Sequence, residues 1–341
     1  MSQKESFRVI WAVDAFPEKK EDFTQAHRLL KALSKGKTIE IVPTYVFNLT
    51  EFYGENDRLG LSIPENSLNE LVSAARKTVQ SLLKPLKGVN FRRPVIISHS
   101  NLTMTSNVKE LEKFAKKTDA NLILVSSHGK KGMARYLMGS FAETLLLKAS
   151  IPTIVVNPKT LVAPSIRKIL FATDLSDQSK AAFGEVCNFA KLMGCQLTLF
   201  YKYIDRLSPV VSAGAPFLGG NYMQDPAQKQ KEIEAARKQL ETLKKQAESK
   251  KLKTKIIIDQ KGGSVSTSIL KNAKQNQLIA MTSRSGWLYT TMIGSVCRNV
   301  VRSASVPVWV IHPKDPPTQE VNKETAGKAH IEGSSPLTLY S

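Results

Sequence analysis

The sequence predicts two tandem, open, doubly wound α/β domains, each with a sheet of five parallel strands covered by helices. Three observations carry this prediction: short apolar runs alternate with longer amphipathic segments, the runs are apolar at nearly every position, and the whole pattern occurs twice. Strands without polar alternation are typical of a parallel sheet that is buried on both faces. Strands that alternate with helices indicate the doubly wound arrangement.

The duplication is visible in two pairs of matching segments. VIWAVDAFPE contains Asp14, and the similar segment KILFATDLSD contains Asp174, 160 residues further along the chain. The segment GSFAETLLLKASIPTIVVNP (139–158) is echoed 155 residues later by GSVCRNVVRSASVPVWVIHP (294–313). Self-similarity at a nearly constant offset identifies a tandem repeat before any single element is assigned.

The predicted domains cover residues 1–158 and 164–313, and the segment LVAPSI (161–166) joins them. A chain of 341 residues suits two domains of ordinary size. Each is long enough to bury a core without disulfides or structural metals. Residues 314–341 are polar, rich in Pro and Gly and without apolar periodicity, so we expect a flexible tail.

The expected strands follow the same order in both repeats. In the first repeat they are FRVIWAV (7–13), TIEIVPTYVF (38–47), RPVIISHS (93–100), ANLILVSS (120–127) and IPTIVVN (151–157). In the second they are KILFAT (168–173), QLTLFYKY (196–203), TKIIID (254–259), QLIAMTS (277–283) and VPVWVI (306–311). Residues 179–194 have apolar side chains at helical spacing and end on Gly194, which predicts a helix with a glycine C-cap.

The composition excludes several classes of protein. Hydrophobic residues make up 42% of the chain, and 49 Lys and Arg against 29 Asp and Glu give a formal net charge of +20. These proportions exclude collagen, wholesale disorder and a small disulfide scaffold. No apolar run approaches the roughly 18–20 residues of a membrane-spanning helix, and the N-terminal segment lacks the features of a secretory signal. The three cysteines lack metal or disulfide spacing, so we expect a cytoplasmic protein with no membrane contact.

The segment VSSHGKKGMARYLMGSFAE (125–143) is the strongest candidate for a phosphate site. It leaves a predicted strand, forms a glycine-bearing loop with Lys130 and other cations, and reaches Gly139-Ser140 at a predicted helix start. Glycine lets backbone N–H groups approach a phosphate, and a helix N-terminus favours negative charge. Ser140 can cap the helix and also hydrogen-bond a ligand oxygen. Asp14 ends the first strand at the same sheet edge, where its carboxylate could accept hydrogen bonds from a ribose or a base.

These residues resemble the universal stress protein family, whose nucleotide-binding members carry G-x2-G-x9-G-[ST] between the fourth strand and the following helix. Gly129, Gly139 and Ser140 match this pattern, while Ser126 replaces its first glycine. Asp14 matches the acidic residue at the end of the family's first strand, which contacts the nucleoside. The resemblance implies that these side chains form a nucleotide site in the first domain.

The resemblance extends over residues 6–313 and implies the adenine nucleotide alpha hydrolase-like, Rossmann-like fold in both repeats. Family members pair through their last strands, so IPTIVV and VPVWVI are expected to pair within this one chain as a pseudo-dimer. Oligomers of a higher order stay open.

The second repeat departs from the family pattern. Asp174 and Gly294-Ser295 match it, but Met281 and Arg284 stand at the positions of the other two glycines. We therefore expect a degenerate nucleotide loop in the second domain. Without such a loop, Asp174 is interpreted as a residue that caps a helix or braces a turn.

Much of the basic charge falls in residues 225–255, which hold ten Lys and Arg against five acids. A nucleic-acid or phospholipid surface is one interpretation. The other is a solvated helix over 226–250, because Glu234 with Lys238 and Glu241 with Lys245 have ion-pair spacing. Aromatic residues for base stacking are absent from the segment, which favours the solvated helix.

The resemblance implies a stress-response regulator or sensor that binds ATP or another adenine nucleotide through its first domain, with Mg²⁺ neutralising the phosphates. The expected binding residues are Asp14, Ser126, Gly129, Lys130, Gly139 and Ser140. No arrangement for efficient catalysis is visible, so at most slow ATP hydrolysis is expected. Two alternatives stay open: a stress-associated interaction protein that binds no nucleotide, and a nucleic-acid-associated protein suggested by charge alone.

Overall fold

The computed structural model describes residues 7–14, 23–48, 65–99, 103–127, 140–157, 159–204, 226–283 and 293–312. The expected tail at 314–341 and residues 128–139 of the expected phosphate loop lie outside these ranges.

Strands and helices alternate in the same order in both halves of the chain. The first half contains β1 (Phe7–Ala12), α1 (Thr24–Ser34), β2 (Ile39–Asn48), α4 (Glu65–Leu83), β3 (Val95–His99), α5 (Met104–Lys117), β4 (Leu122–Ser126), α6 (Ser140–Lys148) and β5 (Thr153–Val156). The second contains β6 (Lys168–Ala172), α7 (Asp177–Met193), β7 (Gln196–Lys202), α8 (Pro226–Ser249), β8 (Thr254–Asp259), α9 (Val265–Ala273), β9 (Leu278–Thr282), α10 (Ser295–Ser303) and β10 (Val308–Ile311).

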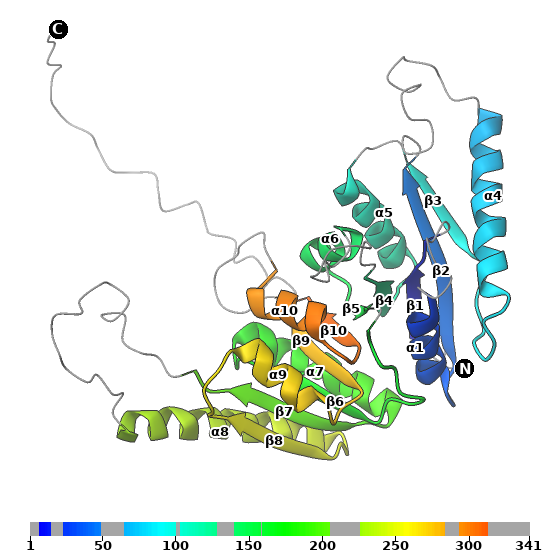
Figure 1. Cartoon of the computed structure of the whole chain (residues 1–341). Helices are drawn as coiled ribbons and strands as arrows, with labels where there is room; N and C mark the ends of the chain where they lie inside the picture. The colour runs from blue at the N-terminus through cyan, green and yellow to red at the C-terminus, as the bar shows by residue number, and fades with distance from the viewer. Residues whose placement is uncertain are drawn as a thin grey trace, which may run out of the picture.

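The strands of both halves form one ten-stranded sheet in the order β3-β2-β1-β4-β5-β10-β9-β6-β7-β8 (Figure 1). Neighbouring strands within each half are parallel. β5 and β10 pair in antiparallel fashion and thereby join the halves. The predicted pair of doubly wound, five-stranded parallel sheets is confirmed, as is the pairing of the two last strands within one chain.

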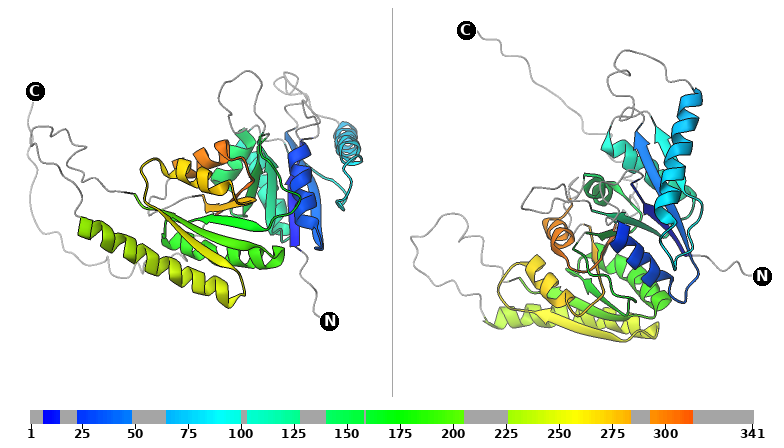
Figure 2. Two further views of the ribbon diagram at one scale, coloured as in Figure 1. Left: turned by 60° about the horizontal axis from the view of Figure 1, so that its bottom comes forward. Right: turned by 45° about the vertical axis from the view of Figure 1, so that its right-hand side comes forward.

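Helices cover both faces of the sheet (Figure 2). On one face, apolar side chains from α1, α7, α8 and the end of α4 form one buried cluster with the strands. On the other face, α5, α6, α9 and α10 contribute to a second cluster. Each cluster includes residues of both halves, so the two domains share their cores. Burial from both sides explains why the strand sequences lack polar alternation.

Helix α7 has the ends that its sequence predicts. The side chain of Ser176 accepts a hydrogen bond from the N–H of Ser179 at the start of the helix, and Gly194 ends it with a φ of 68°. This left-handed conformation is strained for residues with a Cβ atom, so the predicted glycine C-cap is confirmed.

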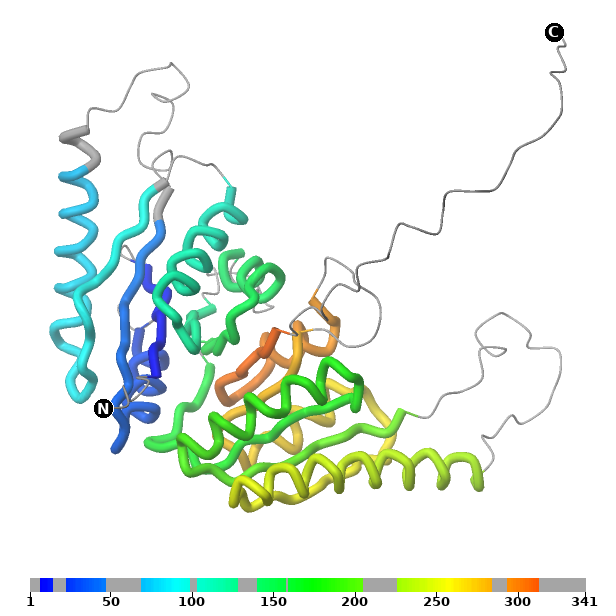
Figure 3. Tube along the Cα trace, turned by 180° about the vertical axis from the view of Figure 1, so that it is seen from behind, coloured from blue at the N-terminus to red at the C-terminus, as the bar shows by residue number. Residues whose placement is uncertain are grey.

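Helix α8 lies beside α7 along the outer part of the second half (Figure 3). It buries an apolar stripe at helical spacing and exposes most of its charged side chains; the buried residues are Ile233, Ala236, Leu240, Leu243 and Ala247. Its ion pairs differ from those predicted, because Lys244 lies 3.6 Å from Glu241 and 4.0 Å from Glu248. The predicted pairs Glu234–Lys238 and Glu241–Lys245 are not formed, although all four residues are described. An exposed lysine can reach several acids within a turn, so sequence spacing does not select one.

The β5–β10 junction has a pseudo-two-fold axis. Ile154 lies opposite Trp309, and these residues are 155 positions apart, which is the repeat offset of this segment. A half-turn exchanges the flanking pairs, which are Thr153 with Val310 and Val155 with Val308. The two halves therefore pack in one chain as the two subunits of a symmetric dimer would.

Polar contacts across this junction are not symmetric. Glu143 on α6 lies 3.3 Å from Nε of Arg298 and 3.6 Å from Nη2 of Arg302, both on α10. Asn157 donates a hydrogen bond of 2.9 Å from Nδ2 to the carbonyl oxygen of Ala304. Glu143 and Arg298 are also 155 positions apart. Two identical domains would therefore place like charges against each other here, whereas this chain places opposite charges.

We expect Trp309→Ala to lower the free energy of unfolding by about 3–5 kcal/mol, because the substitution leaves a large cavity in the core that the two halves share. Trp309 is 2% exposed, and its ring centroid lies 4.6 Å from that of Phe189. Trp309→Phe should cost much less, since it keeps an aromatic ring and removes an Nε1 hydrogen that has no acceptor among the described residues. Urea unfolding of the three proteins measures both costs. Equal costs for the two variants would contradict the packing argument.

Candidate functional site

The two halves each have a topological switch point, between β1 and β4 in the first and between β6 and β9 in the second. The chain leaves β1 toward β2 on one side, whereas β4 lies on the other. β6, β7 and β9 have the same relation in the second half. Helix connections diverge at such a point, so ligands of open α/β sheets bind there, beyond the carboxyl ends of the strands.

In the first half, two of the expected binding residues end neighbouring strands at this point. Ala12 of β1 is the register partner of Val125 of β4, so Asp14 and Ser126 follow at the same sheet edge. Both side chains are half-buried, and each has a contact with another group. Ser140 is the exposed first residue of α6. Gly129, Lys130 and Gly139, as well as His128, lie outside the described residues.

In the second half, the turn from β6 to α7 is braced by its own side chains. Asp174 Oδ1 accepts hydrogen bonds from the N–H of Ser176 at 3.1 Å and from its hydroxyl at 2.7 Å. Thr173 Oγ1 accepts one from the N–H of Leu175 at 3.0 Å and another from the hydroxyl of Ser179 at 2.8 Å. Leu175 has a φ of 62°, a left-handed conformation that costs on the order of 1 kcal/mol for such a residue. The hydrogen bonds hold this strained turn, so the interpretation of Asp174 as a turn-bracing residue is supported.

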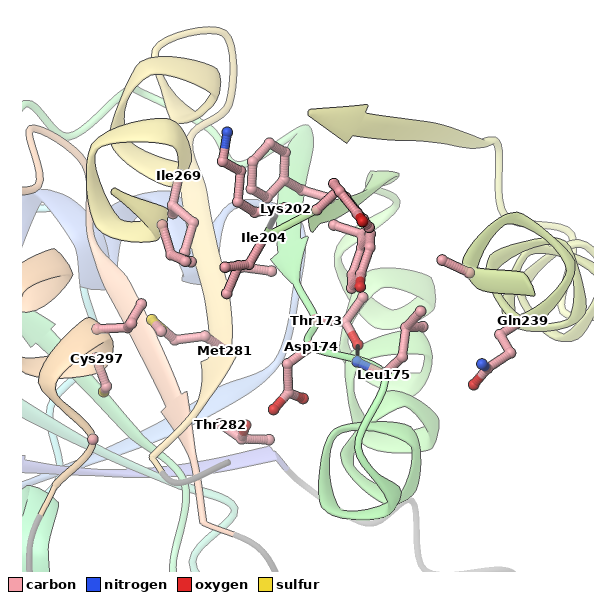
Figure 4. A pocket seen from close by; sticks show the side chains of 18 of the residues that line it. Thr173, Asp174, Leu175, Lys202, Ile204, Gln239, Ile269, Met281, Thr282 and Cys297 are labelled. Atoms are coloured by element: carbon pink, nitrogen blue, oxygen red, sulfur yellow. Dashed lines mark hydrogen bonds between the residues drawn. The ribbon is translucent and has the colours of Figure 1, made fainter. Parts of the chain in front are cut away.

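A cavity of about 760 Å³ opens at this edge of the second half. Its walls come from the ends of β6, β7 and β9, from α8 and α9, and from the first turn of α10. Figure 4 shows Asp174 beside Thr282 at one side, Ile204 and Met281 in the centre and Gln239 of α8 across from them. Gly294 precedes α10, and no side chain of the described residues caps the first turn of this helix. The second half thus contains a cavity even though its loop lacks two of the expected glycines.

A buried ion pair at the cavity wall was not anticipated from the sequence. Lys202 ends β7 and Asp259 ends β8, and these residues are register partners. The Lys202 ammonium lies 3.6 Å from Asp259 Oδ1 and also hydrogen-bonds the carbonyl oxygen of Lys261. The Lys202 side chain is only 4% exposed. Lys202 and Asp259 are oppositely charged residues at the ends of two successive apolar strands, and this sequence pattern could have predicted the pair.

The cysteines are interpreted as inert thiols, and their burial agrees with this. Cys187, Cys195 and Cys297 are 0%, 4% and 2% exposed. Burial raises the pKa of Cys187 to about 11 and the pKa values of Cys195 and Cys297 to about 12. Their reactive thiolate forms are therefore scarce at neutral pH.

The described part of the chain has neither a metal-ligand cluster nor a membrane-spanning helix. No group of three or more His, Cys, Asp or Glu side chains there is arranged to hold a metal ion. Among the described helices, none combines the length and the apolar character needed to cross a bilayer.

Comparison with known proteins gives consistent matches. The sequence profile of the universal stress protein family matches the chain twice, over residues 7–157 and 165–312. A universal stress protein of Mycolicibacterium smegmatis is 25% identical over 256 residues, which cover 74% of this chain and 80% of that protein. A universal stress protein of Methanocaldococcus jannaschii is 30% identical over 126 residues, which cover 37% of this chain and 69% of that protein. The crystal structure of a universal stress protein from Archaeoglobus fulgidus shares the fold, with a TM-score of 0.58, 18% identity and coverage of 91% of this chain and all of that one.

We expect Asp259→Asn to lower the free energy of unfolding by about 3 kcal/mol or more, because it leaves the buried Lys202 ammonium without its counter-charge. Burial raises the pKa of Asp259, but the Lys261 N–H, Ser268 and Lys202 lower it by more, so the pKa lies below its ordinary value. A lowered carboxyl pKa stabilises the fold above the unfolded-state pKa of about 3.9. The difference between wild type and variant should thus be full above about pH 5 and shrink as the pH falls through the folded-state pKa. Urea unfolding at several pH values measures it.

The matched control is Glu241→Gln, which removes an exposed partner of Lys244 and should cost less than about 0.5 kcal/mol. A cost for Asp259→Asn as small as that of the control would show that the buried pair contributes nothing.

We expect the native protein to react slowly with an aromatic disulfide reagent at pH 8, because all three thiols are buried and protonated. The same assay in denaturant should titrate three thiols per chain. Rapid reaction of one thiol in the native protein would contradict the assignment of all three as inert.

Proposed function

Since this chain belongs to the universal stress protein family and carries the family's domain twice, we propose that it is a stress-response regulator that binds ATP or another adenine nucleotide in its first domain. The observation that carries the proposal is that two motif residues of the first domain lie at one switch point: Asp14 follows β1, and Ser126 ends the neighbouring strand β4. In the sequence, Gly129, Gly139 and Ser140 match the family's nucleotide pattern between β4 and α6.

Each residue has a role that its chemistry supports. The Asp14 carboxylate would accept hydrogen bonds from the nucleoside. The backbone of the loop from Ser126 through Gly129 and Lys130 would surround the phosphates, and the Lys130 ammonium would add charge attraction. Gly139-Ser140 would present the N-terminus of α6 to the phosphates, where the helix dipole and free N–H groups favour an anion.

Magnesium fits this site as a companion of the phosphates. Mg²⁺ prefers oxygen ligands and usually keeps several waters, so one or two protein oxygens besides phosphate oxygens suffice. Asp14, Ser126 and Ser140 offer such oxygens.

We propose signalling by nucleotide occupancy, with at most slow ATP hydrolysis, because the motif residues supply binding groups and no general base. The alternative is an interaction protein that binds no nucleotide. Ser126 favours it, since a side chain at the first glycine position reduces the backbone freedom of the loop.

We expect Gly139→Asp to weaken Mg-ATP binding at least about tenfold, because a carboxylate beside the phosphates adds repulsion and bulk. Arg284→Asp, in the corresponding loop of the second domain, should change the affinity less than about twofold. Calorimetric titration of the purified chain with Mg-ATP measures both, and denaturing the protein as purified tests whether it carries a nucleotide.

Two results would overturn the proposal. One is the absence of ATP binding to the wild-type chain at millimolar concentration. The other is an equal loss of affinity in the two variants, which would place the nucleotide outside the first domain.

A further inference from the structure

We propose that the free edge of β8 binds the same edge of a second copy of this chain, so that one sheet continues through a homodimer. β8 lies at one end of the ten-stranded sheet, and among the described residues its only partner strand is β7 (Figure 1). This edge lies at the end of the second half that is remote from the β5–β10 junction. The inference goes beyond the proposed function and does not depend on nucleotide binding.

Every second residue of β8 presents its backbone groups outward. The carbonyl oxygens of Lys253 and Asp259 face β7, where backbone N–H groups donate to them at 2.9 and 3.0 Å. Backbone direction alternates along a strand, so every second residue between these two also faces β7. The outward N–H and C=O groups are therefore those of Thr254, Ile256 and Ile258. Such a row of groups is a template for a further strand.

Three successive isoleucines on β8 are only half-buried, namely Ile256, Ile257 and Ile258. Ile256 and Ile258 pack against the apolar cluster that α8 helps to form, and Ile257 packs against the cluster on the other face of the sheet. The strand is therefore apolar on both of its faces. A strand added beside β8 would cover the part of each isoleucine that is still exposed, which favours association.

The charges of β8 are self-complementary. Lys255 and Asp259 lie two positions before and two positions after Ile257. If two copies pair in antiparallel fashion about a two-fold axis at Ile257, Lys255 of each copy faces Asp259 of the other. The outward backbone groups fit this register, because Ile256 of each copy can exchange two hydrogen bonds with Ile258 of the other. Lys255 and Asp259 then form a non-hydrogen-bonded pair, in which side chains are closest and opposite charges stabilise the contact.

Both charged groups are available for this contact. Lys255 is exposed and has no carboxylate partner in the described part of the chain. The Asp259 carboxylate is held at the end of β8 by the Lys261 N–H at 2.9 Å and by Lys202. A carboxylate has about four lone-pair sites, so it can accept a further ammonium group. A lysine on an edge strand ordinarily discourages association, whereas here Asp259 makes one register favourable.

Other arrangements of the sheet edges lack this complementarity. The opposite edge strand, β3, reads VIISH and contains no pair of opposite charges. A shifted pairing of β8, with the axis at Ile256, would place Lys255 opposite Ile257 instead of a carboxylate. The charge pattern therefore selects β8 over β3, and an axis at Ile257 over one at Ile256.

Sedimentation equilibrium of the full chain tests the dimer. We expect reversible association with a micromolar dissociation constant, because a single strand pair makes a small interface. Lys255→Glu should weaken association at least about tenfold, because the new carboxylate would face Asp259 of the second copy. The matched control is Lys271→Glu, at an exposed position of α9, which changes the net charge equally and should alter the affinity less than about twofold. Thermal unfolding confirms that each variant folds.

Ile257→Cys tests the register. In the proposed dimer this position faces itself in a non-hydrogen-bonded pair, whose Cα atoms lie about 4.5 Å apart, within the reach of a disulfide. Mild oxidation should therefore join two chains covalently. Ile256→Cys is the matched control on the same strand, and it should cross-link little because it would face Ile258 of the second copy. The three native thiols are buried and do not interfere.

Three results would each overturn the inference. One is a wild-type chain that stays monomeric at millimolar concentration. Another is an equal effect of Lys255→Glu and Lys271→Glu on association, which would place the interface elsewhere. The third is stronger cross-linking of Ile256→Cys than of Ile257→Cys, which would contradict the register. None of these measurements involves a nucleotide, so their failure would leave the function proposed above untouched.

Discussion

Two short strands, β5 and β10, supply the hydrogen bonds that convert two five-stranded sheets into one. Each would otherwise be an apolar sheet edge with unpaired backbone groups, which favours aggregation. Their pairing also lets the helices of one half complete the core of the other. The rings of Phe7, Phe189 and Trp309 form a chain of contacts from β1 through α7 to β10, with centroid separations of 5.8 Å and 4.6 Å. The position of the two switch points relative to each other depends on this junction.

Fusion of the two domains in one chain has allowed equivalent positions to diverge. Glu143 and Arg298 attract each other across the pseudo-axis, an arrangement that two identical subunits could not make at this position. The two halves also differ at the carboxyl ends of their strands. Lys202 corresponds in register to Val46 of β2, so the second half has a buried ion pair at a place where the first half has an apolar side chain. The first copy of the motif has glycine at two of its three glycine positions, whereas the second copy has it only at Gly294.

The turn at Thr173–Ser176 shows how hydrogen bonds stabilise a strained backbone conformation at the end of β6. Leu175 is held in a left-handed conformation by hydrogen bonds from its neighbours, and α7 begins at once with Ser176 as its cap. The backbone therefore reverses within a few residues after β6, which leaves Asp174 at the cavity edge. Such local strain is tolerated where the surrounding hydrogen bonds and packing over-determine it.

The sequence by itself determined the repeat, the order of strands and helices and the glycine end of α7, because each depends on local periodicity or on self-comparison. The pairing of the last strands was expected from the family resemblance alone. It also placed Asp14 and Ser126 at strand ends of one sheet edge. Only the tertiary structure decided which charges meet. The Lys202–Asp259 pair, the contact of Glu143 with α10 and the cavity beside Asp174 join residues that are far apart in the chain. Sequence spacing says nothing about such contacts, because strand register and the packing of helices across the sheet fix them.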